Sequence, residues 1–302
     1  MTTDKDFDII IIGGSYAGLS AAMALGRSLR KVLIIDSGQP CNKQTPHSHN
    51  FITGDGERPA AIAVKAREQV LNYETVTFQP GLVTEGSGKN NAFEIKTGEG
   101  LRFSARKLLF ATGLKDIPPP VEGFAECWGI SVLHCPYCHG YEVRGERTGI
   151  LANGDMAVDF ARLISNWTSD LTVFTNGNSG LSEEQSAIIA AAGVRVIEKE
   201  ILRIEHEAGK IGQLVFTDGS KEPVTALYAR PGFTQHCPVP ELLGCELTEQ
   251  GFIKVDEMKR TTIPGVYAAG DNTSPMRALS TAIAAGTMAG AALNKEWIDQ
   301  RF

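Results

Sequence analysis

The chain begins with a strand, a glycine turn and a helix, and this order constrains the fold more than any other feature. Residues 7–12 are almost continuously apolar, as in a buried parallel strand. The turn at 13–18 precedes a predicted helix at 19–25 and a second strand at 31–35 that ends on Asp36. A strand–helix–strand unit predicts an α/β protein with a parallel sheet.

The same turn predicts a dinucleotide-binding site. Gly13 and Gly18 occupy the first and third glycine positions of G-x-G-x-x-G, and Ser15 occupies the second. Gly13 permits the sharp turn, small residues let backbone amides approach a pyrophosphate, and Gly18 allows close helix packing. Asp36, about 20 residues further on, suits a ribose hydroxyl. A generic glycine-rich turn in another α/β protein remains the alternative.

The middle of the chain predicts a change of architecture and a domain crossing. Residues 76–109 alternate as short strands, with turns at 86–88 and 98–100, as in an antiparallel meander. Residues 107–110 form another apolar strand. The prolines at 118–120 cannot continue a helix or a central strand, so they mark the crossing into a second domain.

A second strand–turn–helix unit follows. Residues 149–152 predict a strand, 156–166 a helix and 171–174 the next strand, which repeats the plan of the first unit. Near the end, residues 265–271 predict a strand running into a turn, and 282–293 predict a helix of small residues.

Composition narrows the functional class. The 302 residues are enough for two medium domains, and 42% hydrophobic with 21% charged residues is ordinary for globular proteins. A net charge of −6 argues against a nucleic-acid surface. Residues 1–6 lack the features of a secretory signal, and no apolar run reaches the roughly 18 residues of a membrane span. We therefore expect a soluble cytoplasmic protein without nucleic-acid or membrane partners.

One closely spaced pair stands out among the six cysteines, Cys135 and Cys138 in His-Cys-Pro-Tyr-Cys-His-Gly. A structural disulfide framework is not expected in a cytosolic chain of this length, which points to redox or metal chemistry. A cysteine near a helix N-terminus or beside a histidine is pushed towards the reactive thiolate. Pro136 stiffens the small loop, and His139 is placed to move protons near neutral pH.

Three other interpretations of this segment remain open. C-x-x-C-H is formally a c-type haem attachment signature, but such attachment needs an exported or dedicated setting. A zinc site could recruit His134, Cys135, Cys138 and His139, with Cys127, although no second ligand pair is present. Two inert buried thiols are the third alternative. His47 and His49 are expected to lie in a polar, solvated loop.

The order and spacing of four motifs resembles that of low-molecular-weight thioredoxin reductases, which are FAD-dependent disulfide oxidoreductases. The motifs are residues 13–18, 111–113, 135–138 and 265–271, and the resemblance covers nearly the whole chain. It implies an α/β fold of two Rossmann-like three-layer nucleotide-binding domains, the second inserted into a discontinuous FAD domain. The FAD domain would span 1–117 and 246–302, and the insert 118–245. A homodimer is also implied.

The resemblance also implies roles for individual residues. Cys138 would face the flavin, Cys135 would attack the partner disulfide, and His139 would take the acid–base place of an aspartate. No metal is implied. The positions expected to bind FAD are Gly13, Ser15, Tyr16, Ala17, Gly18, Asp36, Asn42, Asn50, Val83, Ala111, Thr112, Gly113, Gly270, Asp271 and Ser280.

The departures from the family pattern concern the NADPH site. The family's three glycines followed by aspartate read Ala152-Asn153-Gly154-Asp155 here, and the bulkier residues should obstruct a pyrophosphate. Residues 175–178 contain no arginine for a 2′-phosphate. NADPH is therefore doubtful as the usual donor, and His139 makes the chain similar to a branch that includes bacterial and fungal dithiol oxidases.

Two questions of function stay open at this point. The enzyme would pass electrons between flavin, the dithiol and a thioredoxin-like protein or a small dithiol/disulfide, or it would act as a dithiol oxidase that reduces oxygen. A non-catalytic flavin-binding redox sensor is the alternative of another class. The tail at 297–302 could cover a flavin, or it could be a frayed terminal helix.

Overall fold

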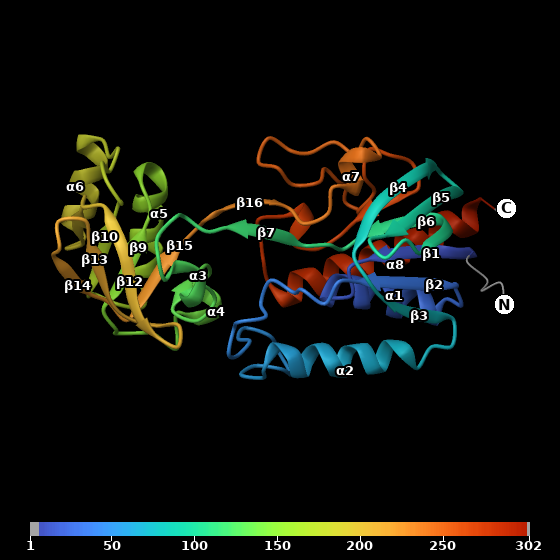
Figure 1. The fold of residues 1–302 in the computed structure, drawn as a ribbon, viewed down its shortest axis with the longest axis horizontal. Coiled ribbons are helices and arrows are strands. Elements are labelled where there is room, and N and C mark those ends of the chain that lie inside the picture. Colours follow the sequence, from blue (N-terminus) through green and yellow to red (C-terminus); the bar gives the residue numbers. More distant parts are fainter. Residues whose placement is uncertain (1–5, 301–302) are drawn as a thin grey trace. The chain divides into compact units, whose positions relative to one another are not determined.

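The computed structural model describes residues 6–300 and divides into two compact units (Figure 1). The first unit comprises residues 1–43, 59–115 and 233–302, and the second comprises 44–58 and 116–232. The chain first passes from the first unit to the second at residues 115/116, close to the expected domain boundary at 117/118. The chain returns to the first unit at residues 232/233, before the expected boundary at 245/246. Residues 44–58 group with the second unit.

The first unit is built on a parallel sheet. Its strands lie in the order β3-β2-β1-β6, and β17 pairs with the end of β6. All of these pairs are parallel. The strands are β1 (Asp6–Ile12), β2 (Val32–Asp36), β3 (Val76–Pro80), β6 (Arg102–Phe110) and β17 (Val266–Ala268). The predicted strand–helix–strand unit at the start of the chain is therefore confirmed.

An antiparallel extension leaves the same sheet. Strand β4 (Val83–Lys89) pairs with β5 (Ala92–Thr97), and β5 pairs with the first half of β6. The predicted meander is correct for these strands but wrong for β3, which pairs parallel with β2. The reason is helix α2 (Pro59–Leu71), which connects β2 to β3, because a helical crossover returns the chain in the same direction.

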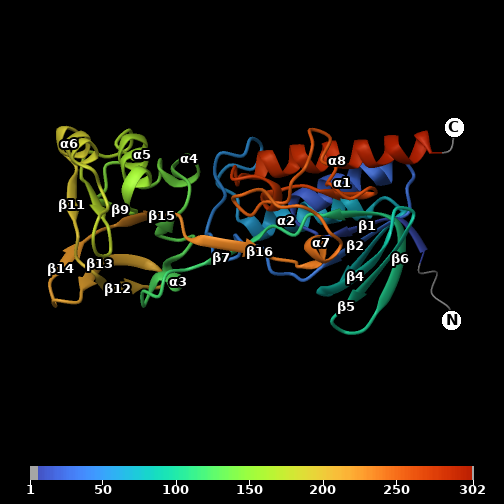
Figure 2. The same cartoon turned by 90° about the horizontal axis from the view of Figure 1, so that it is seen from above.

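Two small-residue helices cover the parallel sheet. Helix α1 (Tyr16–Arg27) and helix α8 (Leu279–Asp299) lie side by side (Figure 2). A Cβ atom added to Gly286 would lie 2.0 Å from the Ala17 carbonyl oxygen, and one on Gly290 would lie 2.8 Å from that of Ala21. The two helices can therefore approach this closely only because α8 carries glycine at both positions.

The second unit repeats the parallel plan. Its five-stranded sheet has the order β11-β10-β9-β15-β8, and α5 and α6 connect β9 to β10 and β10 to β11. The elements are β8 (Val132–Leu133), β9 (Thr148–Leu151), α5 (Gly154–Ile164), β10 (Leu171–Phe174), α6 (Glu183–Ala191), β11 (Arg195–Ile197) and β15 (Ala226–Ala229).

The remaining elements complete both units. An antiparallel sheet in the second unit consists of β12 (Ile201–Glu207), β13 (Lys210–Phe216) and β14 (Lys221–Pro223). The chain crosses between the units in two strands that pair with each other, β7 (Leu114–Ile117) and β16 (Gly232–Gln235). The short helices are α3 (Phe124–Cys127), α4 (Pro136–His139), α7 (Val239–Leu242) and the 3-10 turn Asp271–Thr273.

Residues 44–58, which we call the 44–58 loop, form a closed loop within the second unit. The Ser48 amide donates to the Glu57 carbonyl at 2.8 Å, and the Gly56 amide donates to the Ser48 carbonyl at 2.8 Å. The Gln44 side chain donates to the Ala125 carbonyl at 3.3 Å. These bonds hold the loop against the segment around α3.

The end of α8 packs on its own unit. Trp297 is only 8% exposed, and the Arg30 guanidinium lies 3.8 Å from the centre of its ring. A frayed terminal helix is therefore wrong for Trp297–Asp299, and the indole is not an exposed cover. Arg301 and Phe302, the rest of the predicted covering tail, lie outside the described residues.

Between residues 6 and 300, no helix combines the length and apolar character needed to cross a membrane.

Candidate functional site

The two cysteines of the motif meet at the start of helix α4. Cys135 is the extended N-cap residue and Pro136 is the first helical residue, where its missing amide hydrogen costs no hydrogen bond. The Cys138 amide donates to the Cys135 carbonyl at 3.2 Å, and the two Sγ atoms lie 2.7 Å apart. The structure thus places both thiols within reach of a disulfide, whose bond length is about 2.05 Å.

The surroundings push the acidities of the two thiols apart. The pKa of Cys135 is lowered mainly because its sulfur accepts a hydrogen bond from Cys138, with help from the Cys138 and Tyr137 amides and the Arg230 charge. The pKa of Cys138 is raised by the same bond and by burial. Cys135 is therefore the thiol that ionises first, and the thiolate is the reactive form.

His139 ends helix α4 and is partly buried. Both ring nitrogens are buried, and the imidazole interacts with the Cys135 backbone. Burial lowers the pKa of His139, a charge on His49 lowers it further, and Glu142 and the Cys135 backbone oppose both. The imidazole is therefore neutral at neutral pH, which is the form that can accept a proton.

Sequence reasoning missed three residues of this cluster. Arg230 follows strand β15 and acts on Cys135, and Tyr228, in the same strand, has a buried hydroxyl without a partner among the described residues. Burial and then the neighbouring Cys135, Glu142 and Cys138 raise the pKa of Tyr228. Their place at the carboxyl end of a parallel strand was the available signal, because ligand sites collect there.

The third missed residue is His49. It was expected to be a solvated loop residue, but its side chain is only 21% exposed and its ring centre lies 6.5 Å from that of His139. The expectation was wrong because it treated the loop as isolated, whereas the 44–58 loop packs within the second unit. On the other flank of the motif, His134 packs edge-on against Trp128, so the two flanking histidines have different partners.

In the first unit, the glycine turn has the geometry of a pyrophosphate cradle. A Cβ on Gly13 would lie 2.2 Å from the Ala111 carbonyl oxygen, and one on Gly18 would lie 1.9 Å from that of Gly13, so only glycine fits at either position. Ser15 is the N-cap of α1, yet its side chain makes no capping hydrogen bond. The amides at this helix end are therefore available to an anion.

Two further predicted segments converge on this turn. The Ala111 amide donates to the Ile12 carbonyl at 2.7 Å, which places 111–113 beside the end of β1. Gly270, with φ of +100°, lies against Ala17, and Asp271 opens the 3-10 turn, 3.7 Å from the Arg277 side chain. The neighbouring Asn272 was not predicted. It is fully buried and its Oδ1 has no partner among residues 6–300.

Asp36 and a pocket beside it complete the site. The carboxylate accepts the Gly14 amide at 2.6 Å and the Gly38 amide at 2.8 Å. A pocket of about 410 Å³ lies between Asp36, Arg67 and Phe78, a volume within the usual range for small-molecule sites. The Arg67 guanidinium lies 4.3 Å from the centre of the Phe78 ring, and its Nε is buried without a partner in the described part of the chain.

The remaining predicted cofactor positions are more scattered. Tyr16 donates to the Pro59 carbonyl at 3.3 Å, and its hydroxyl also interacts with Asn42. Val83 is buried in the core of the first unit, and Ser280 is exposed in the first turn of α8. Asn50 belongs to the second unit, so the structure does not group it with the other positions.

In the second unit, the turn before helix α5 occupies the position of the family's NADPH-binding turn. The Gly154 amide at the start of α5 donates to the Ser179 carbonyl at 3.2 Å. The Glu198 carboxylate accepts the Ser179 amide at 2.9 Å, and Asp155 lies in the first turn of the helix. Acceptor oxygens and negative charge therefore occupy the place where a pyrophosphate would need donors.

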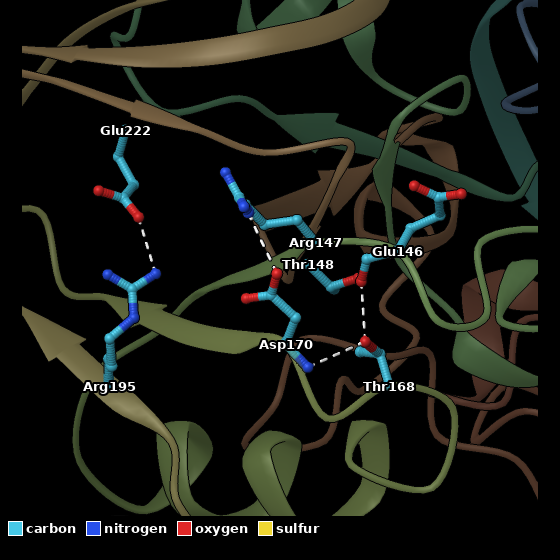
Figure 3. Close-up of polar contacts among 7 residues, drawn as sticks. All are labelled: Glu146, Arg147, Thr148, Thr168, Asp170, Arg195 and Glu222. Atoms are coloured by element: carbon cyan, nitrogen blue, oxygen red, sulfur yellow. Dashed lines mark hydrogen bonds and ion pairs between the residues drawn. The ribbon is translucent and has the colours of Figure 1, made fainter.

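Figure 3 shows Arg147 and Arg195, two arginines of this sheet, with their carboxylate partners. Arg147 precedes β9 and pairs with Asp170 at 3.1 Å, and Arg195 begins β11 and pairs with Glu222 at 2.7 Å. Nucleotide phosphates bind at the carboxyl ends of parallel strands, whereas these residues mark the amino ends. Neither arginine replaces the missing basic cluster.

Comparison with known proteins agrees with this arrangement. The family model for pyridine nucleotide-disulphide oxidoreductases matches residues 7–289. Thioredoxin reductase tcpT of Claviceps purpurea is 34% identical, over 96% of this chain and 94% of its own length. Thioredoxin reductase sirT of Leptosphaeria maculans is 32% identical, over 97% and 95%.

A solved structure supports the same assignment. The crystal structure of an oxidoreductase from Agrobacterium tumefaciens is 38% identical, with a TM-score of 0.91 over 97% of this chain and 99% of that chain. The two Rossmann-like units agree with these relatives in fold. The chain belongs to the pyridine nucleotide-disulphide oxidoreductase family and is a thioredoxin reductase-like, FAD-dependent oxidoreductase.

Proposed function

We propose that this protein exchanges electrons between FAD and the Cys135–Cys138 dithiol, and onward with a protein or small-molecule disulfide, without NADPH as its usual donor. The observation that carries the proposal is the thiol pair at the start of α4, with Sγ atoms 2.7 Å apart and opposite pKa shifts. Groups whose environments push their pKa values apart are typical of redox and acid–base sites.

The residues of the first unit fit the cofactor. The Gly13–Gly18 turn would hold the pyrophosphate, and Asp36 with the pocket beside Arg67 would hold the adenosine part. The unsatisfied Oδ1 of Asn272 and Nε of Arg67 are available to hydrogen-bond a ligand. When bound, FAD supplies the two-electron acceptor and donor for the dithiol.

The dithiol performs the thiol exchange. The Cys135 thiolate attacks one sulfur of the substrate disulfide, which breaks that S–S bond and releases a thiolate. Cys138 then attacks the mixed disulfide at Cys135, releasing the second thiol and closing the Cys135–Cys138 disulfide. His139, neutral and adjacent to Cys138, accepts the proton that Cys138 loses as it attacks. In the oxidising direction the same bonds form and break in reverse.

The donor is the part of the family pattern that the structure favours least. The Ser179 carbonyl already accepts the Gly154 amide at the start of α5, and the Glu198 carboxylate accepts the Ser179 amide. Arg147 and Arg195 are paired with carboxylates at the amino ends of the strands. We infer that NADPH binds weakly or not at all in the second unit. The hydrogen bonds at the start of α5 support a second candidate, a dithiol oxidase that passes the electrons to oxygen.

Two measurements test the function. In Cys138→Ser, Cys135 should trap a mixed disulfide with a disulfide probe such as 5,5′-dithiobis(2-nitrobenzoate), whereas Cys135→Ser should not trap it at Cys138. Parallel assays of NADPH oxidation and of oxygen uptake with dithiothreitol separate the two candidates. NADPH oxidation at a rate typical of enzymes, about 1 s⁻¹ or faster, would contradict the inference about the donor.

The partner and the dimer are proposed from the resemblance, and the cytoplasmic location is proposed from the sequence features given above. The partner would be a thioredoxin-like protein or a small dithiol/disulfide, and the enzyme would act in the cytoplasm as a homodimer. A flavin-binding redox sensor without turnover would bind FAD, yet it would show no exchange between the dithiol and any disulfide probe. Size-exclusion chromatography with light scattering tests the dimer.

A further inference from the structure

We propose that His49 and His139 form a histidine pair that relays a proton between the Cys135–Cys138 dithiol and solvent, with Glu142 as its carboxylate partner. The inference rests on the proposed dithiol chemistry and adds to it a residue from a distant part of the chain. His49 lies in the 44–58 loop, and His139 ends helix α4. His49 acts through His139 and is therefore a positioning and relay residue.

The geometry places His49 between the buried imidazole and two carboxylates. The ring centres of His49 and His139 are 6.5 Å apart and the rings meet edge-on. On its other side, His49 Nδ1 lies 3.6 Å from Glu142 Oε1 and 3.7 Å from Asp55 Oδ1. At this separation, one bridging water or a small rotation of either ring connects the imidazoles.

The loop holds His49 in this place by its own backbone bonds. Ser48 is bonded through both its amide and its carbonyl, to Glu57 and Gly56 at 2.8 Å each, and Ser48 itself is buried. The Asp55 carboxylate accepts the Asn50 amide at 2.8 Å. These bonds fix the backbone on both sides of His49.

Exposure increases along the proposed path. The His139 nitrogens are buried, the His49 side chain is 21% exposed, that of Glu142 is 38% exposed and that of Asp55 is 67% exposed. A proton on His139 faces the Cys135 backbone, whereas one on His49 faces two carboxylates. The path therefore leads from the interior to groups in contact with solvent.

The charges around the pair favour a single shared proton. A positive His49 lowers the pKa of His139, and Glu142 raises it, so one imidazolium is stabilised and two repel each other. The other titratable groups facing the pair are the dithiol, the Tyr228 hydroxyl beside Glu142, Asp55, and His47 with its ring 6.4 Å from that of His49. Glu142 and Asp55 are the carboxylates of this group.

The relay completes the balance of the redox step. When the dithiol is oxidised, two S–H bonds break and one S–S bond forms, and bound FAD would supply the acceptor for the electron pair and for one of the two protons. The other proton goes to His139, then to His49 and to water. In the reducing direction, the same path returns a proton to the thiols.

The test uses the FAD-loaded enzyme and reads both the histidine and the redox step. In protein labelled with ¹³C at histidine Cε1, the signal of His139 is assigned by its loss in His139→Gln and is followed against pH. His49→Gln removes the repelling charge and should raise the pKa of His139, whereas Glu142→Gln should lower it. His47→Gln is the matched control from the same loop and should leave the pKa of His139 unchanged.

The kinetic arm measures flavin reduction by dithiothreitol in a stopped-flow instrument. His49→Gln should slow it at least about tenfold, part of the 10²–10⁴-fold that a positioned acid–base group contributes. A His139 titration that is unchanged in both variants, or an unchanged rate in His49→Gln, overturns the relay. If His49→Gln fails to fold, the exposed Glu142→Gln still decides the direction of the shift. If wild-type flavin is not reduced at all, the proposed function fails instead.

Discussion

Replacing Gly286 by alanine tests how closely helix α8 must pack on α1. An added Cβ would lie 2.0 Å from the Ala17 carbonyl oxygen and 2.8 Å from its carbonyl carbon, whereas ordinary contacts begin near 3.4 Å. These are backbone atoms that no side-chain rotation can move. The helices would have to separate by more than an ångström, and Ala17 belongs to the turn that we assign to the FAD pyrophosphate.

The magnitude follows from two opposing terms. Glycine to alanine in a helix interior gains about 1 kcal/mol of helix propensity, and overpacking costs about 1–3 kcal/mol. Because the clash is with backbone, we expect the upper end for Gly286→Ala, a net loss of about 2 kcal/mol. Gly290→Ala has the same propensity gain but a milder contact, 2.8 Å from the Ala21 oxygen, so it should stay within about 1 kcal/mol of wild type.

The assay is thermal unfolding followed by circular dichroism, with FAD release recorded by fluorescence in the same experiment. Gly286→Ala should unfold several degrees below Gly290→Ala and should release FAD earlier. Both substitutions replace glycine by alanine in the same helix, so the gain in helix propensity is the same and cancels when the two variants are compared. The reasoning is refuted if Gly286→Ala is as stable as Gly290→Ala, or if it keeps FAD as tightly as wild type.

Two further substitutions test other parts of the structure. Lys107→Met should destabilise the fold by about 3 kcal/mol in denaturant unfolding, because the fully buried Lys107 Nζ donates to Asn90 and Glu296. Its loss leaves the Glu296 carboxylate with the neutral donors Tyr267 and Gln300 in place of a buried cation. Adding Glu296→Leu should recover part of that loss, and no recovery would contradict the pairing. Arg230→Gln should raise the pKa of Cys135 and so move the pH profile of its alkylation by iodoacetamide to higher pH, while Arg147→Gln at the opposite sheet edge should not.

The sequence predicted those parts of the fold that depend on local patterns. The turn at 13–18 and the strand at 171–174 were placed correctly because an apolar run and a glycine turn are local signals. The direction of β3 was not predicted, because it depends on the helical crossover through α2. The grouping of the 44–58 loop with the second unit depends on contacts between distant segments, which no local pattern records.

The candidate site divides in the same way. Cys135 and Cys138 follow from their spacing, and the structure brings their sulfurs together. Tyr228 and Arg230 become neighbours of the dithiol only when β15 enters the sheet next to β8 and β9. His49 belongs to the dithiol cluster because the 44–58 loop groups with the second unit, although the chain on both sides of it belongs to the first. Asn272 follows the predicted Asp271, and only the structure shows that its side chain is fully buried.

The central claim is that flavin electrons pass through the Cys135–Cys138 pair. Anaerobic titration of the purified flavoprotein with dithiothreitol, followed by its visible spectrum, measures this directly. The account predicts that the flavin bands of wild type disappear in proportion to the added dithiol, and that those of Cys138→Ser persist. Equally fast loss of the flavin bands in Cys138→Ser would contradict it.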